Sequence, residues 1–114
     1  MNSEATWSND FSGFVSANGV SLQSEGLYEV GLTIEDALQA VAIAAASGIL
    51  ILGGDVKWRR DGEIVPAYMN WSTDDAIGEP EGDYYRRSWE KSTRYLSNLP
   101  PPLYGDYLIV IVTA

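Results

Sequence analysis

Cysteine and histidine are both absent from this chain of 114 residues. Without cysteine the chain can form no disulfide bond, thiolate metal site or thiol nucleophile. Without histidine it lacks the most usual general base and the commonest metal ligand. These absences count against catalysis, and we expect the protein not to be an enzyme and to need no cofactor or metal.

Long apolar runs are also missing. A membrane-spanning helix needs about 20 predominantly apolar residues in a row, and no run in this sequence approaches that length. The first 14 residues have neither the basic region nor the apolar core of a signal peptide. We therefore expect a protein of the cytoplasm that does not contact membranes.

Basic residues are absent from the first half of the chain. Residues 1–56 contain seven acids and no Lys or Arg, and all seven bases lie between Lys57 and Arg94. The formal net charge is −9. A field of this sign repels nucleic acid and anionic membranes and attracts a basic protein. Solubility alone is the alternative reason for an acidic chain, so the charge by itself leaves both interpretations open.

The remaining composition predicts one folded domain. Apolar residues make up 46% of the chain, which argues against disorder, and a chain of this length can bury a self-sufficient core. We predict an N-terminal arm over residues 1–26, packed on or flanking a domain of residues 27–114. In the arm, Trp7, Phe11 and Phe14 have the spacing of one helix face.

An apolar run followed by glycines begins the most informative segment, residues 49–71. Residues 49–52 read as a strand buried on both faces. Gly53 and Gly54 follow and predict a turn that ends this strand, because glycine adopts backbone conformations that other residues resist. We interpret Asp55 as a cap of that turn, and a contact to a partner protein is the alternative.

A β-hairpin is predicted next, with its turn at Asp61-Gly62. The register that this turn sets pairs Trp58 with Val65 and Val56 with Ala67. Strand alternation then separates two faces. The face expected to be core comprises Val56, Trp58, Val65, Ala67 and Met69. The mixed face, which we expect to meet solvent or a partner, comprises Asp55, Lys57, Arg59, Ile64, Pro66 and Tyr68.

Two helices and a C-terminal strand complete the predicted fold. The first helix, over about residues 33–47, begins at a Thr33 N-cap, and its many alanines indicate close packing on several sides. The second, over about 80–96, has a core-facing stripe of Tyr85, Trp89, Ser92 and Leu96. Residues 107–113 are mostly β-branched or aromatic and predict a strand in the middle of the sheet. We predict an α+β fold, in which a small mixed β-sheet, made of the hairpin and a central C-terminal strand, is packed by two main helices.

The order and spacing of two short motifs carry a family resemblance. Gly53-Gly54-Asp55 and Asn70-Trp71, with the Arg-Ser-Trp-Glu stretch of the second helix, resemble the immunity protein 40 family of bacterial polymorphic toxin systems. The resemblance runs from about Leu27 to Val112 and leaves out residues 1–26 and the triple proline. It implies a small α+β protein that binds a cognate toxin and neutralises it by stoichiometric occlusion.

The partner-binding surface is expected on the mixed face of the hairpin and in the acidic loop after it. A Trp can anchor such an interface, although packing under the loop is the alternative for Trp71. An acidic surface would speed encounter with a toxin that is basic. The predicted partner-binding residues are Asp55, Tyr68, Asn70, Trp71, Asp74 and Asp75.

Two other function classes are compatible with the same residues. Asp55, Asp74 and Asp75 could serve a small carboxylate-dependent enzyme, with Trp58 or Trp71 as a sugar platform. A carbohydrate-binding or ligand-binding module is the other alternative. A deep pocket with converging Asp and Trp side chains would favour these two classes. A flat acidic face with an exposed aromatic side chain would favour inhibition of a protein.

Overall fold

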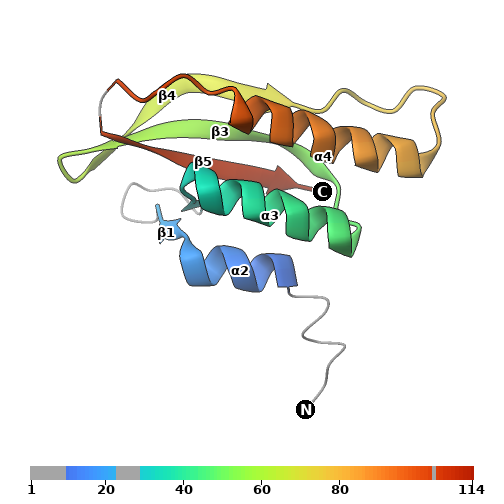
Figure 1. The fold of residues 1–114 in the computed structure, drawn as a ribbon, viewed down its shortest axis with the longest axis horizontal. Helices are drawn as coiled ribbons and strands as arrows, with labels where there is room; N and C mark the ends of the chain where they lie inside the picture. Colours follow the sequence, from blue (N-terminus) through green and yellow to red (C-terminus); the bar gives the residue numbers. More distant parts are fainter. Residues whose placement is uncertain (1–9, 23–28, 104) are drawn as a thin grey trace, which may run out of the picture.

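A computed structural model describes residues 10–22, 29–103 and 105–114 (Figure 1). Within these ranges the helices are α2 (Asp10–Asn18), α3 (Ile34–Ser47) and α4 (Glu81–Ser97). The strands are β1 (Val20–Ser21), β2 (Val30–Gly31), β3 (Ile51–Arg60), β4 (Glu63–Ser72) and β5 (Asp106–Thr113). None of the helices in this part of the chain combines the length and apolar character needed to span a bilayer.

The main sheet is antiparallel and has the strand order β4-β3-β5, and β1 and β2 form a small antiparallel pair. The predicted α+β class is confirmed. The sheet is not mixed, however, and its central strand is β3 and not the C-terminal strand. On the other edge of β5, Leu32 and Ile109 exchange two backbone hydrogen bonds of 2.8 and 2.7 Å.

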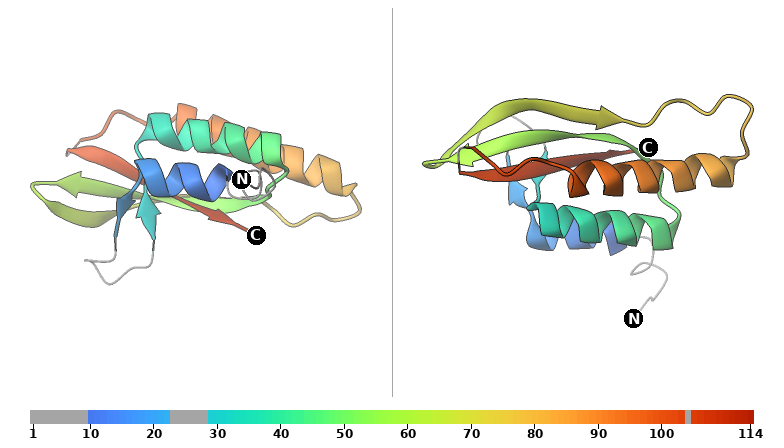
Figure 2. Two further views of the ribbon diagram at one scale, coloured as in Figure 1. Left: turned by 90° about the horizontal axis from the view of Figure 1, so that it is seen from below. Right: turned by 45° about the horizontal axis from the view of Figure 1, so that its top comes forward.

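The sequence of β5 is apolar because both of its faces are covered. We call the face on which α3 and α4 pack the inner face of the sheet, and the opposite one the outer face (Figure 2). Tyr107 and Ile109 belong to the main core on the inner face. Leu108 and Val110 pack against Leu22 in a smaller outer cluster. Burial on both faces therefore gives an edge strand the composition expected of a central one.

Helix α3 begins and ends as its sequence predicts. The Thr33 side chain accepts a hydrogen bond of 3.2 Å from the backbone N–H of Asp36, and Gly48 ends the helix in the left-handed conformation. The helix lies between α2 and α4 (Figure 1). Ala40 and Ala44 are fully buried, so the alanines do allow close packing on more than one side.

The N-terminal predictions are tested only in part. Phe11 and Phe14 lie in α2 and pack on the main core, as their spacing indicated. Trp7 and the proposed boundary between residues 26 and 27 lie outside the described residues. The division into an arm and a domain stays a prediction.

The hairpin follows its predicted register only near the turn. Trp58 pairs with Val65 as expected, but Val56 pairs with Met69 and not with Ala67. The register shifts between Val56 and Lys57, where β4 carries a bulge that contains Ala67 and Tyr68. The predicted faces survive this shift: Val56 is buried in the core, and Trp58, Ala67 and Met69 pack against it.

Gly53 and Gly54 do not end a strand, because β3 runs through them without a turn. Both glycines instead make room for Trp71 on β4. A Cβ atom at Gly54 would lie 2.2 Å from the Trp71 ring, and one at Gly53 would lie 2.2 Å from the Trp71 carbonyl oxygen. Asp55 therefore has no turn to cap, and that interpretation is wrong.

Candidate partner-binding surface

The two motifs that carry the family resemblance are cross-strand neighbours. Gly54 pairs with Trp71, and Asp55 pairs with Asn70. Alternation along the strands turns the first pair inward and the second outward. Asn70 is exposed and Asp55 is half-exposed, and the Asp55 carboxylate lies 3.7 Å from Nζ of Lys57. One half of each motif thus supports the core, and the other half forms part of the outer face.

Trp71 is a core residue. Its side chain is only 5% exposed, stacks on Tyr95 with 5.0 Å between ring centroids, and donates a 3.0 Å hydrogen bond from Nε1 to the Ser92 hydroxyl. Partial burial of Tyr95 itself raises the pKa of its hydroxyl group. So little of the indole reaches the surface that packing under the loop, the alternative interpretation of Trp71, describes its position, and its contact with a partner stays a prediction.

Tyr68 projects from the β4 bulge and is 90% exposed. Its φ of 58° lies in the left-handed region, where a non-glycine residue loses about 1–2 kcal/mol to contact between Cβ and the backbone. Bulges re-aim side chains, and strained backbone often marks binding sites. At Tyr68 an unfavourable backbone conformation therefore coincides with an aromatic ring that is exposed to solvent.

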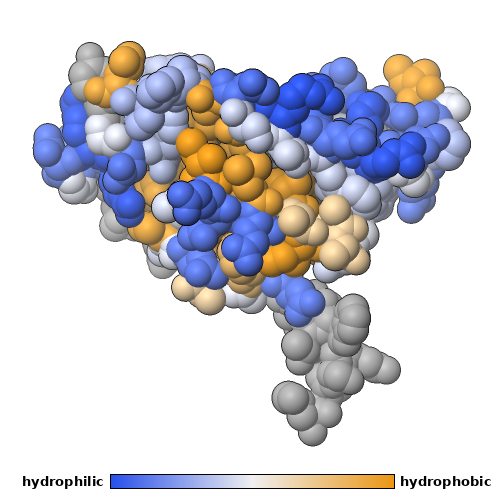
Figure 3. All heavy atoms as spheres, in the orientation of Figure 1, coloured by the Kyte–Doolittle hydropathy of each residue, from blue (hydrophilic) through white to orange (hydrophobic). Residues whose placement is uncertain are grey.

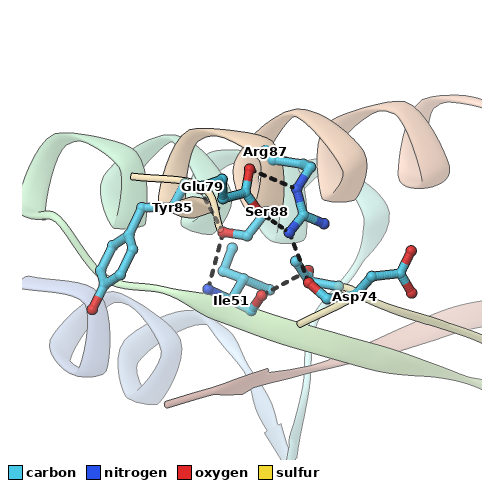
Figure 4. Close-up of polar contacts among 7 residues, drawn as sticks. Ile51, Asp74, Glu79, Tyr85, Arg87 and Ser88 are labelled. Carbon is cyan, nitrogen blue, oxygen red and sulfur yellow. Dashed lines mark hydrogen bonds and ion pairs between the residues drawn. The ribbon is translucent and has the colours of Figure 1, made fainter. Parts of the chain in front are cut away.

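The loop between β4 and α4, residues 73–80, is anchored at several points (Figure 4). The hydroxyl of Thr73 donates a 2.9 Å hydrogen bond to the Ile51 carbonyl, and Nη2 of Arg87 donates one of 2.8 Å to the Asp74 carbonyl. Arg87 also forms an ion pair with Glu79, and the hydrogen bond to this carboxylate raises the pKa of Arg87. The loop, which we call the acidic loop, is thus anchored at both of its ends.

A buried serine fixes the base of the acidic loop. The Ser88 hydroxyl accepts a 3.2 Å hydrogen bond from the backbone N–H of Ile51 and donates one of 2.7 Å to the Tyr85 carbonyl (Figure 4). It joins the first residue of β3 to α4. The exposed side chains of Asp74 and Asp75 therefore extend from a firmly connected backbone.

Ile77 is a surface residue that the sequence interpretation missed. It is 90% exposed, as Tyr68 is, and it lies in the acidic loop. Its sequence signal is the short apolar pair Ala76-Ile77 between Asp75 and Gly78, in a segment without strand or helix periodicity. Single exposed apolar residues are normal on protein surfaces, so the exposure of Ile77 makes it available to a partner without requiring one.

The acidic loop and the first turn of α4 carry an excess of negative charge. Arg86 and Arg87 pair with Asp83 and Glu79. No ion pair among the described residues involves the three remaining acids of this region, Asp74, Asp75 and Glu81. Figure 3 shows a mostly hydrophilic surface where this loop and the start of α4 lie. A basic partner would find unneutralised carboxylates here.

The residues proposed for carbohydrate or carboxylate chemistry do not converge. Trp58 packs with the inner-face core, stacked on Tyr107 at 4.7 Å, whereas Asp55 lies on the outer face. Asp74 and Asp75 belong to the exposed loop. In the described ranges no group of three or more acidic side chains could hold a metal ion. The arrangement is an open acidic surface with an exposed aromatic ring, which suits protein contact.

Comparison with known proteins identifies a family. The family model for immunity protein 40 matches residues 21–113. No curated protein and no solved structure is significantly similar to the chain. The match begins before Leu27 and includes the triple proline, so it is longer than the motifs alone indicated. The chain belongs to the immunity protein 40 family.

Proposed function

We propose that this protein neutralises one cognate bacterial toxin by binding it and occluding its working surface, in the cytoplasm and without chemistry of its own. The observation that carries the proposal is the family match over residues 21–113, which implies a toxin-immunity role. The exposed surface beside the family motifs supports it.

The proposed contact surface comprises the outer side of β4 and the acidic loop. Tyr68 and Ile77 are its apolar anchors, because both are almost fully exposed. Asp55 and Asn70 supply polar contacts between them, and the carboxylates of the acidic loop attract a basic toxin. Anchors of this kind mainly slow dissociation, and exposed charges mainly speed association.

Protection of growth by stoichiometric amounts of the protein is the first expected result. Cells that express the toxin encoded beside this chain should survive when this protein is co-expressed, and the two proteins should co-purify. In a titration of the purified toxin, activity should fall linearly and vanish at one equivalent. The linear course is expected because occlusion consumes one inhibitor for each toxin.

Two outcomes of these experiments, one in the growth assay and one in the titration, would contradict the proposal. Growth arrest despite folded, soluble protein would show that this toxin is not the partner. Complete inactivation by a small fraction of an equivalent would mean that the protein acts catalytically and would overturn the occlusion mechanism.

A strong dependence of association on salt is the second expected result. Exposed charges are screened over about 8–10 Å at moderate ionic strength. The association rate should therefore fall about tenfold or more between low and high salt, while the dissociation rate changes little. Surface-based kinetics would measure both rates.

A double variant provides the control for the charge argument. Asp74→Asn with Asp75→Asn preserves side-chain size and removes two charges, so its association rate should depend less on salt than that of the parent. If the parent already associates at a rate independent of salt, the net charge serves solubility and not encounter.

A further inference from the structure

An apolar groove lies between α3 and α4, on the face of the molecule shown in Figure 3. Its volume is about 760 Å³, and its walls include Leu38, Ala42 and Ala45 of α3 and Trp89 of α4. The two alanines leave space where longer side chains would close the groove. Nε1 of Trp89 donates a 2.6 Å hydrogen bond to the Ile49 carbonyl, so the ring is held as a rigid wall.

The charges along this groove are opposite to those of the acidic loop. Arg86, Glu90 and Arg94 line its α4 side at intervals of four residues, which places them in one row. Two of these three side chains are basic, and the α3 residues that line the groove are uncharged. The basic toxin proposed above would find no charge complement here, whereas a helix with acidic residues at one end would.

The chain itself contains such a helix. Helix α4 has Glu81 and Asp83 in its first turn and Arg94 in its last turn. In an antiparallel pair of α4 helices, the acidic end of each lies beside the basic end of the other. The register that sets Arg94 against Glu81 also sets Glu90 of each copy against Arg86 of the other, whose guanidinium also pairs with Asp83 of its own helix. Both sets of charges are complementary at once, and the helix dipoles are antiparallel.

We propose that a second copy of this chain occupies the groove, in a two-fold symmetric dimer in which α4 of each copy packs between α3 and α4 of the other. Such an interface is self-complementary, as two-fold symmetry requires. Small residues on α3 allow the helix axes to approach to about 8–10 Å, the distance typical of packed helices. Tyr68, Asp74 and Asp75 do not line the groove, and of the acidic surface only Glu81 enters this contact, so the proposal does not depend on the toxin.

The test is the oligomeric state of the full chain in solution. Light scattering and sedimentation equilibrium, from micromolar to submillimolar concentration, should give twice the mass of the chain with reversible dissociation on dilution. Ala42→Glu fills with a long side chain the space in which the partner's α4 would pack, and it should weaken the dimer at least tenfold. Gln39→Glu is the matched control, because Gln39 is exposed on the same helix, does not line the groove and undergoes the same charge change. It should leave the dimer intact.

A charge exchange tests the antiparallel register. Arg94→Glu alone should weaken the dimer, and Arg94→Glu combined with Glu81→Arg should restore it. Both sites are exposed, so these variants also keep the test valid if Ala42→Glu does not fold. A parent that is monomeric at every concentration would overturn the proposal. So would equal dimerisation of the Ala42→Glu and Gln39→Glu proteins, or failure of the exchange to restore the dimer.

Discussion

Trp71→Ala is expected to lower the free energy of unfolding by about 3–5 kcal/mol. The indole is buried, stacks on Tyr95 and donates its N–H to Ser92. The strand beside it carries Gly53 and Gly54, which have no side chains to move into the space that the ring would leave. A cavity that cannot collapse has the highest cost in such substitutions, and the loss should appear in both urea and thermal unfolding.

One variant separates the packing of Trp71 from its hydrogen bond, and another serves as the control. Trp71→Phe keeps an aromatic ring and leaves the Ser92 hydroxyl without its donor, so it should cost about 1–3 kcal/mol. Trp58→Ala is the control for removal of an indole. Trp58 is half-buried, so its loss should be clearly smaller than that of Trp71. If Trp71→Ala unfolds like the parent, or if Trp58→Ala is the more damaging change, the core is wrongly assigned.

The same contact makes a complementary prediction at Gly54. Gly54→Ala places a methyl group 2.2 Å from the present position of the Trp71 ring, so the strands or the ring must move. Overpacking of this kind costs about 1–3 kcal/mol. The destabilisation by Gly54→Ala should be smaller in a Trp71→Ala background, because the ring is absent there, and the part that remains belongs to the Val110 carbonyl oxygen, 2.6 Å from the same Cβ position. Equal losses in both backgrounds would place the steric conflict elsewhere.

The part of the hairpin beside its turn could be predicted because its signal is local. Asp61 and Gly62 both have positive φ, 51° and 80°, as a two-residue hairpin turn of this sequence requires. The bulge at Ala67 and Tyr68 could not be predicted. It adds two residues to β4, and because side chains alternate with a period of two, the faces before and after it remain the same. The apolar pattern is identical with and without the bulge.

Gly53 and Gly54 were misinterpreted because the residue that requires glycine at these positions is distant in the sequence. Adjacent glycines indicate a turn when only local conformational freedom is considered. Their partner is Trp71 on the next strand, and no local pattern contains that contact. The family motifs record it indirectly, because the glycines and the tryptophan belong to two separate motifs that the fold sets side by side.

The surface could be predicted only where polarity and secondary structure agree. Asp74 and Asp75 are acidic residues in a loop, and their exposure follows from that. Trp71 and Ile77 were the difficult cases, because an aromatic residue beside a loop is compatible with core or interface, and an apolar loop residue carries no periodicity. The contacts of Trp71 place it in the core, and the exposure of Ile77 places it on the surface.

Tyr68 offers the sharpest test of the proposed toxin contact, because stability and binding should change in opposite directions. Tyr68→Gly removes an exposed ring and also the Cβ that is unfavourable at a φ of 58°. Relief of strain is offset in part by the backbone entropy of glycine, so the protein should be as stable as the parent or more stable by up to about 1 kcal/mol. Toxin affinity should fall about 30-fold, as for an interface anchor that contributes about 2 kcal/mol.

Three further variants assign such a loss to the ring. Tyr68→Phe keeps the ring and should retain most of the affinity. Tyr68→Ala loses it without relief of strain, so it should bind as weakly as Tyr68→Gly and be less stable than that variant. Leu103→Ala truncates another exposed side chain, 80% exposed and outside the proposed surface, and should bind like the parent. Calorimetric titration and thermal unfolding measure the two quantities separately. If Tyr68→Gly binds with the affinity of the parent, the bulge does not contact the toxin, and the acidic loop with Ile77 becomes the surface to test.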